Sequence, residues 1–206
     1  MIKKLLLSGT IGAGKSTMIR QCLLPYLPCI GGFYVQRILK DGQLIAFRLR
    51  PISVNTDYQL SLAVDNLKGL DDLFLHADQH GGWQRNDQVF LETGVNCLRQ
   101  SFESNNKLIL LDELGGIELH IAAFMAEVYR IFKSPMPVLG VVKAPSNAQI
   151  LERAKTGKGV MDVNLSFIEY LNNHETAAMI NVGQENRDAV AVTVKKFVEE
   201  VCNDQK

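Results

Sequence analysis

The sequence predicts an α/β fold in which a mostly parallel β-sheet is covered by helices on both faces. Short apolar runs alternate with amphipathic helical segments along the chain, and this alternation is typical of parallel strands joined by helical crossovers. The 206 residues are 47% hydrophobic and 21% charged, which suits a globular domain with a large buried core. We therefore expect residues 1–206 to form a single domain.

The first strand, the turn after it and the first helix carry the most selective pattern in the chain. Residues 2–7 read as a buried strand, and residues 15–24 place Met18, Ile19 and Leu23 on one helical face until Pro25 ends the helix. Between them, residues 9–16 read GTIGAGKS and match the phosphate-loop pattern G-x-x-x-x-G-K-[ST]. Backbone N–H groups of such a loop point at a phosphate, and the helix N-terminus adds partial positive charge.

This loop predicts a site for a nucleoside triphosphate and the fold of a phosphate-loop (P-loop) NTPase. We expect the Lys15 ammonium to reach the β- and γ-phosphates and the Ser16 hydroxyl to ligate Mg²⁺. The loop residues predicted to bind the nucleotide are Gly9, Thr10, Ile11, Gly12, Ala13, Gly14, Lys15, Ser16 and Thr17.

After the first helix, the alternation is interrupted at residues 32–86. Residues 32–50 read as a β-hairpin with its turn at residues 40–43, and residues 51–86 read as a partly irregular insertion near the nucleotide. Arg37, at the end of the first hairpin strand, is a candidate phosphate contact. Tyr34 and Trp83 are candidates for stacking on a base.

A second pattern follows at residues 107–113, where the apolar run KLILL ends in Asp112 and Glu113. We expect this strand to lie next to the strand that precedes the phosphate loop, so that Asp112 helps to hold Mg²⁺. Glu113 is then placed to orient or deprotonate an attacking water. Lys15 and Glu113 are the predicted catalytic residues, and the carboxylate pair favours hydrolysis over transfer to another acceptor.

The rest of the chain continues the alternation. We expect helices over residues 89–102, 118–132, 148–155 and 187–201, and strands over residues 137–142 and 178–182. Lys143 follows a strand at the edge where open α/β sheets bind ligands. Arg153, Lys155 and Lys158 surround a glycine-rich loop that could form a lid carrying a cationic finger.

Charge and cysteine usage limit the partners that we expect. Lys plus Arg equals Asp plus Glu at 22 each, so no strongly basic field indicates nucleic acid or an anionic membrane. The apolar run at the start of the chain is too short for a signal peptide. The four cysteines have no C-x-x-C spacing, which favours reduced thiols in a cytoplasmic protein. A protein partner is neither indicated nor excluded.

Several segments together resemble a known family, the small nucleoside-triphosphatases first described from thermophiles. They are the phosphate loop, residues 32–34 (GFY), residues 110–115 (LLDELG) followed by 117–119 (IEL), and residues 186–188 (NRD). The resemblance covers most of the chain and is sparse between residues 51 and 86. It implies a RecA-like fold and Mg²⁺-dependent hydrolysis of ATP, GTP and other nucleotides with loose base selectivity. It also implies a place for Arg187 near the base or the triphosphate.

The chain departs from the family pattern at three positions. Gly116 stands where members usually carry a basic residue, and Leu44 and Ala46 stand where an arginine and a glycine are usual. We expect a missing cation beside the γ-phosphate to lower the rate of hydrolysis more than the affinity for the nucleotide. Two other functions therefore stay open: a nucleotide or small-metabolite kinase with an acceptor pocket in residues 51–86, and a slow nucleotide-dependent accessory factor.

Overall fold

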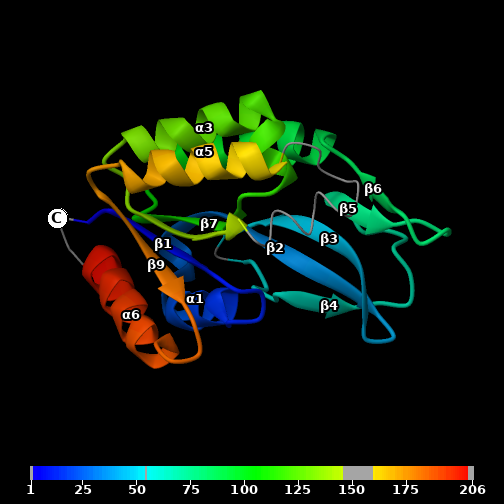
Figure 1. Cartoon of the computed structure of the whole chain (residues 1–206), viewed down its shortest axis with the longest axis horizontal. Coiled ribbons are helices and arrows are strands. Elements are labelled where there is room, and N and C mark those ends of the chain that lie inside the picture. The colour runs from blue at the N-terminus through cyan, green and yellow to red at the C-terminus, as the bar shows by residue number, and fades with distance from the viewer. Residues whose placement is uncertain (1, 54, 146–159, 204–206) are drawn as a thin grey trace.

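The computed structural model of the chain (Figure 1) describes residues 2–53, 55–145 and 160–203. Across these residues the strands form one nine-stranded sheet, and helices lie above and below it (Figure 1). The predicted α/β fold with helices on both faces is confirmed.

The centre of the sheet is parallel. Its strands lie in the order β2 (Ile30–Lys40), β7 (Leu108–Leu114), β8 (Val138–Val142), β1 (Lys4–Gly9) and β9 (Ala177–Val182). Every residue of β1 and β8 is buried. Helices cover both faces of these strands, which is why they read as continuous apolar runs rather than as alternating ones.

The predicted hairpin is present, and the insertion after it continues the sheet. Strand β3 (Gln43–Pro51) pairs antiparallel with β2. Strands β5 (Leu73–Ala77) and β6 (Trp83–Arg85) extend this edge with further antiparallel pairs, and β4 (Ser61–Ala63) pairs with the outer part of β2. The insertion is thus more regular than expected, because strands of three to five residues carry little periodic pattern.

The helices form two layers. One face of the sheet carries α1 (Lys15–Leu23), η1 (Leu24–Cys29) and α6 (Arg187–Asn203), and the other carries α2 (Val95–Glu103), α3 (Ala122–Lys133) and α5 (Val160–Asn172). The sequence did not predict α5, because this segment is rich in poor helix formers such as aspartate, asparagine and β-branched residues. Buried Phe167 and Leu171 anchor it to the core. The helix expected at residues 148–155 lies outside the described residues.

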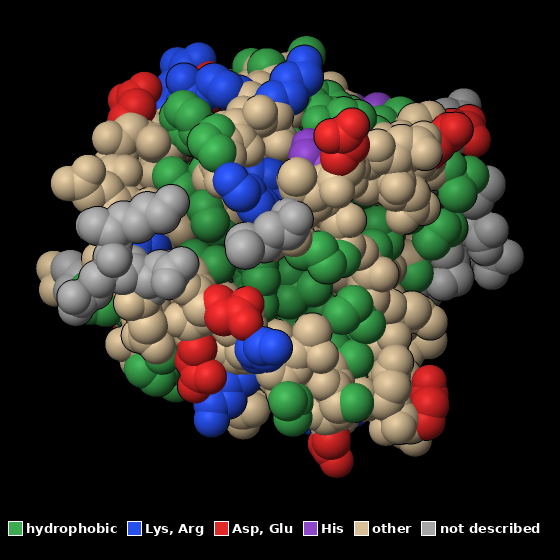
Figure 2. Space-filling view, turned by 90° about the vertical axis from the view of Figure 1, so that its left-hand side faces the viewer, with side chains coloured by type: hydrophobic (Ala, Val, Ile, Leu, Met, Phe, Trp, Pro, Cys, Tyr) green, Lys and Arg blue, Asp and Glu red, His purple; other side chains and the backbone are tan. Residues whose placement is uncertain are grey.

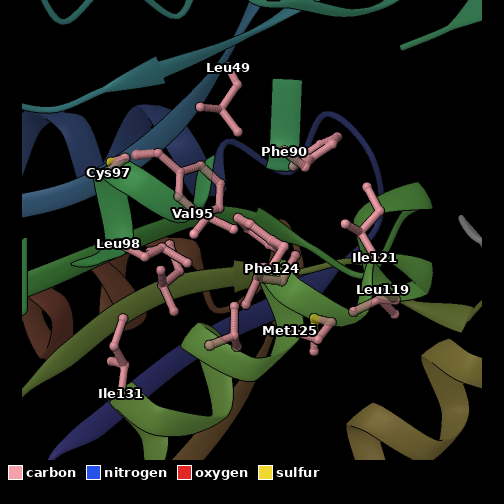
Figure 3. Packing of buried hydrophobic residues seen from close by; sticks show 14 of the residues in the cluster. Leu49, Phe90, Val95, Cys97, Leu98, Leu119, Ile121, Phe124, Met125 and Ile131 are labelled. Carbon is pink, nitrogen blue, oxygen red and sulfur yellow. The ribbon is translucent and has the colours of Figure 1, made fainter. Parts of the chain in front are cut away.

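The core beneath α2 and α3 is built around packed aromatic rings (Figure 3). The Phe124 ring centroid lies 5.3 Å from that of Phe90 and 5.7 Å from that of Phe33. The helix expected over residues 89–102 begins with a π-helical turn, η2 (Phe90–Gly94), before α2. A Cβ atom on Gly94 would lie 2.9 Å from the Phe124 ring, so this turn brings the backbone directly against the aromatic cluster.

The helix expected from residue 118 begins later, at Ala122. A short 3₁₀ turn, η3 (Ile117–His120), connects β7 to it, because buried Ile117 and Leu119 dock this segment into the core first. Among the described residues, no helix is both long enough and apolar enough to cross a membrane.

Figure 2 shows the side of the molecule toward which α5 runs, where α6 also ends. Basic and acidic side chains are interspersed over this face (Figure 2). A hollow of about 850 Å³ between Lys3, Lys133, Tyr170 and His174 lies at the amino ends of the parallel strands. The residues that carry the predicted chemistry lie at the opposite, carboxyl ends of these strands.

Candidate active site

The phosphate loop runs from the end of β1 to the start of α1 and depends on glycine at two close approaches. Gly9 has a φ of +123°, and a Cβ atom there would lie 2.3 Å from the Val182 carbonyl oxygen. Gly14 has a φ of +83°, and a Cβ atom there would lie 3.0 Å from the Arg187 guanidinium. Because L side chains rarely adopt such φ values, both positions favour glycine.

Lys15 directs its side chain back into the loop. Its Nζ donates to the carbonyl oxygens of Gly9, at 3.0 Å, and of Thr10, at 2.8 Å. Burial lowers the pKa of this ammonium, and the Glu113 and Asp112 carboxylates act against that shift. The amine is therefore held at the mouth of the loop, close to both predicted carboxylates.

Asp112 is buried beside the first turn of α1. The Ser16 hydroxyl donates to its Oδ1 at 3.0 Å, and within the described part of the chain its Oδ2 is buried without a hydrogen-bond partner. Burial, followed by repulsion from Glu113, raises the pKa of this carboxyl from 3.8 to about 7. The Ser16 hydrogen bond and the charges of Arg37 and Lys15 oppose that rise.

These two residues fit a magnesium site. A buried carboxylate oxygen without a partner is costly unless a cation or donor meets it. The Ser16 hydroxyl and the Asp112 carboxylate are hard oxygen ligands of the kind that Mg²⁺ prefers, and Mg²⁺ is usually held by one or two such groups together with substrate phosphates. Ser16 and Asp112 can therefore hold the ion at the place that the sequence predicts.

The order of the strands differs from the one expected. Strand β8 lies between β7 and β1, so the prediction that the Asp112 strand directly neighbours β1 is wrong. The chain crosses from β7 through α3 into the position beside β1, and parallel strands still end at one edge of the sheet. Asp112 consequently reaches Ser16 past the end of β8. Lys143 directly follows β8.

Glu113 forms an ion pair with this lysine. The Lys143 Nζ lies 3.5 Å from Glu113 Oε2, and the two side chains are 23% and 29% exposed. Burial alone would lower the pKa of the Lys143 ammonium, but the Glu113 and Glu118 carboxylates outweigh it and raise that pKa. The two carboxylates thus favour the charged form of Lys143, at the same edge of the sheet as the phosphate loop.

Two buried residues that sequence reasoning missed hold the turn after β7. Glu118 Oε1 accepts hydrogen bonds from the backbone N–H groups of Gly115, at 2.6 Å, and Gly116, at 2.7 Å. Asn164 of α5 donates to the carbonyl oxygens of Gly115, at 3.1 Å, and Lys143, at 3.2 Å. Glu118 belongs to the string 117–119 that carries the family resemblance, but the sequence assigned it no role. Asn164 had no signal, because its helix was not predicted.

The other candidates separate into two groups. Arg187 begins α6 with its guanidinium against Gly14 of the phosphate loop, and Arg37 lies close enough to lower the pKa of Asp112. Tyr34 is fully buried with its ring centroid 4.5 Å from that of Tyr58, so it is a core residue rather than a platform for a base. Trp83 packs near Phe47 in the extension of the sheet. Arg153, Lys155 and Lys158 lie outside the described residues.

The sequence is similar to proteins of known activity. A family model described as NTPase matches residues 4–168. The nucleoside-triphosphatase THEP1 of Thermotoga petrophila is 30% identical over 175 residues, which cover 79% of this chain and 84% of that protein. The THEP1 of another Thermotoga species is 26% identical over 207 residues, with 94% and 96% covered.

Solved structures have the same fold. The crystal structure of THEP1 from the hyperthermophile Aquifex aeolicus matches with a TM-score of 0.60 at 18% identity, covering 95% of this chain and 99% of that one. The solution structure of a human cancer-related nucleoside triphosphatase matches with a TM-score of 0.62 at 17% identity, covering 99% and 100%. At these identities the likeness supports the fold alone.

Proposed function

The chain belongs to the NTPase family, and we propose that it hydrolyses a nucleoside triphosphate such as ATP or GTP to the diphosphate and phosphate. The observation that carries the proposal is the hydrogen bond of 3.0 Å between Ser16 Oγ and Asp112 Oδ1 beside the phosphate loop. This bond brings the two proposed magnesium ligands together. Glu113, which we propose orients the attacking water, is the residue after Asp112. The nucleoside-triphosphatases to which the sequence is similar support the same reaction.

Each residue has a part in this reaction. The loop amides and the Lys15 ammonium neutralise charge on the β- and γ-phosphates. Ser16 and Asp112 would hold Mg²⁺, which would supply further positive charge to the bound triphosphate. Glu113 accepts a hydrogen bond from water and orients it toward the γ-phosphorus, in line with the bond to the leaving diphosphate. Arg187, against the outer side of Gly14, contacts the bound nucleotide.

We also propose that the protein selects loosely among bases and that it is cytoplasmic. All of the assigned residues lie around the phosphate loop, and this supports loose selectivity for the base. The four cysteines are free thiols, which supports a cytoplasmic location. Neither nucleic acid nor a membrane is needed for the reaction as proposed.

The test is phosphate release by the purified protein with Mg²⁺ and each of ATP, GTP, CTP and UTP. We expect turnover without any acceptor molecule. Lys15→Ala abolishes it, and Glu113→Gln lowers it by at least about 100-fold, because both remove groups that act on the reacting phosphate. Matched controls are Lys196→Ala and Glu200→Gln, an exposed pair on α6, which leave the rate unchanged.

Other outcomes point to the alternatives. Phosphate transfer that requires an added nucleotide or metabolite, and survives Glu113→Gln, indicates a kinase. Tight binding of nucleotide with negligible release on its own indicates an accessory factor whose hydrolysis depends on a partner protein.

A further inference from the structure

Lys143 is a second cation in the site. It follows β8, and β8 lies between the strand that ends in the carboxylate pair and the strand that ends in the phosphate loop. Its Nζ lies 3.5 Å from Glu113 Oε2, and Asp112 is near enough to act on the same ammonium. Lys143 therefore enters the site from the end of β8, whereas Lys15 enters it from the start of α1.

Gly116 provides the space that this side chain occupies. A Cβ atom built on Gly116 would lie 2.9 Å from Lys143 Nζ and 2.9 Å from Glu118 Oε2. A larger residue at position 116 would thus collide with the ammonium or displace it. Position 116 carries no side chain, and the ammonium of a lysine from the neighbouring strand lies close to where one would begin.

The backbone of Lys143 is held by hydrogen bonds on both sides. The Lys143 backbone N–H donates to the Leu114 carbonyl at 2.8 Å, and its carbonyl accepts from Asn164. Asn164 also binds the Gly115 carbonyl, so one buried amide ties the end of β8 to the turn after β7. This support fixes the point from which the lysine side chain extends, and the ion pair with Glu113 holds its far end.

We propose that Lys143 is a catalytic residue that binds the γ-phosphate and, through its ion pair, holds Glu113 toward the attacking water. The inference rests on the proposed function, because it concerns the same bound triphosphate. A lysine ammonium has three donors, and the contact with Glu113 uses one of them. The ammonium balances the two carboxylates and the charge that develops on the γ-phosphate oxygens, as Lys15 does from the opposite side.

The decisive measurement is the affinity for a diphosphate and for a triphosphate that cannot be hydrolysed. With Mg²⁺ present, calorimetry gives the Kd of ADP and of AMPPNP for the wild type and for Lys143→Ala. We expect Lys143→Ala to weaken AMPPNP by about 10- to 100-fold, the value of a hydrogen bond to a charged group. ADP has no γ-phosphate, so its Kd stays within about twofold. Lys133→Ala, an exposed lysine on α3, changes neither.

Moving the charge provides a second, independent readout. In the double variant Lys143→Ala, Gly116→Lys, the new lysine enters the vacated volume, and we expect it to restore most of the AMPPNP affinity. Gly116→Lys alone places two ammonium groups in one space and weakens AMPPNP instead. Melting temperatures of all variants verify that they are folded.

Equal weakening of ADP and AMPPNP by Lys143→Ala, or no weakening of either, overturns the proposal and leaves the lysine as a structural partner of Glu113. The binding comparison does not need turnover. A wild-type protein that binds AMPPNP more tightly than ADP through Lys143 but releases no phosphate therefore contradicts the proposed function alone. A wild type that binds neither nucleotide contradicts both.

Discussion

Asp112 shows at the scale of one residue how function opposes stability. Burial raises the pKa of its carboxyl from 3.8 to about 7, so between these values the folded state binds more protons than the unfolded state. The stability that the protonated Asp112 carboxyl contributes is then fully present below its unfolded-state pKa, and it is lost as pH rises through its folded-state pKa. At pH 8 the folded protein carries a buried charge that Ser16 only partly compensates.

Asp112→Asn is therefore expected to stabilise the protein at pH 8 while it abolishes phosphate release. The amide keeps an oxygen for the Ser16 hydroxyl and removes the charge, for a gain on the order of 4 kcal/mol in the free energy of unfolding. The gain vanishes near pH 4, where the wild-type carboxyl is protonated in the folded state. Urea unfolding at both pH values measures it, with exposed Asp65→Asn as the control. Equal or lower stability at pH 8 contradicts the raised pKa.

The residues of the site differ in how well the sequence predicts them. The positions of Lys15 and Ser16 follow from a contiguous pattern whose geometry is local. The contact of Asp112 with Ser16 spans 96 positions, yet it needed only the rule that parallel strands end at one edge. The same rule made Lys143 a candidate, but its contact with Glu113 depends on β8 lying beside β7. Asn164 belongs to a helix that is held by tertiary packing and is not encoded in a local pattern.

At the scale of elements, the packing around the π-helical turn η2 explains why position 94 favours glycine. The sequence predicts a plain helix over residues 89–102 that Gly94 weakens. In the structure, the Phe124 ring lies where a side chain at position 94 would begin. Phe124 is fully buried and is packed against Phe33 and Phe90, so its ring has no room to move.

Gly94→Ala is consequently expected to destabilise the protein. Alanine favours a helix over glycine by about 1 kcal/mol, but overpacking a rigid core costs about 1–3 kcal/mol, and contacts of 2.9 Å with a ring place this site at the upper end. We expect a net loss of about 1–2 kcal/mol by urea unfolding. Leu91→Ala, an exposed position in the same turn, changes stability by less than about 0.5 kcal/mol. A more stable Gly94→Ala variant would contradict this account of η2.

Other elements could be predicted where a few adjacent residues carry a recognisable sequence pattern. The hairpin of β2 and β3 has a turn at Asp41 and Gly42 with positive φ at both residues, which their residue types favour. Strands β4 and β6 have three residues each and no pattern to find. Helix α5 forms because Phe167 and Leu171 are buried, and this contribution outweighs its low intrinsic propensity.

At the scale of the whole molecule, the site draws on residues from both layers and from the centre of the sheet. Lys15 and Arg187 come from one helical layer, Asn164 comes from the other, and the carboxylates come from β7. The strands of the central sheet contribute to the cores on both of its faces. We propose that this arrangement unfolds as one domain, including the antiparallel extension at β5 and β6.

Nucleotide binding provides the test, because Trp83 of β6 is the single tryptophan of the chain. Its fluorescence reports on the extension, and circular dichroism reports on the whole sheet and its helices. At about 100 times its Kd, Mg-ADP stabilises the folded state by about 2.7 kcal/mol, which raises the melting temperature by about 5–10 °C for a chain of this size. We expect both signals to give one transition and the same shift, and Lys15→Ala to remove the shift from both. A fluorescence transition that precedes the circular dichroism transition and ignores the nucleotide would instead show that the extension folds as a separate unit, with the phosphate site confined to the parallel sheet.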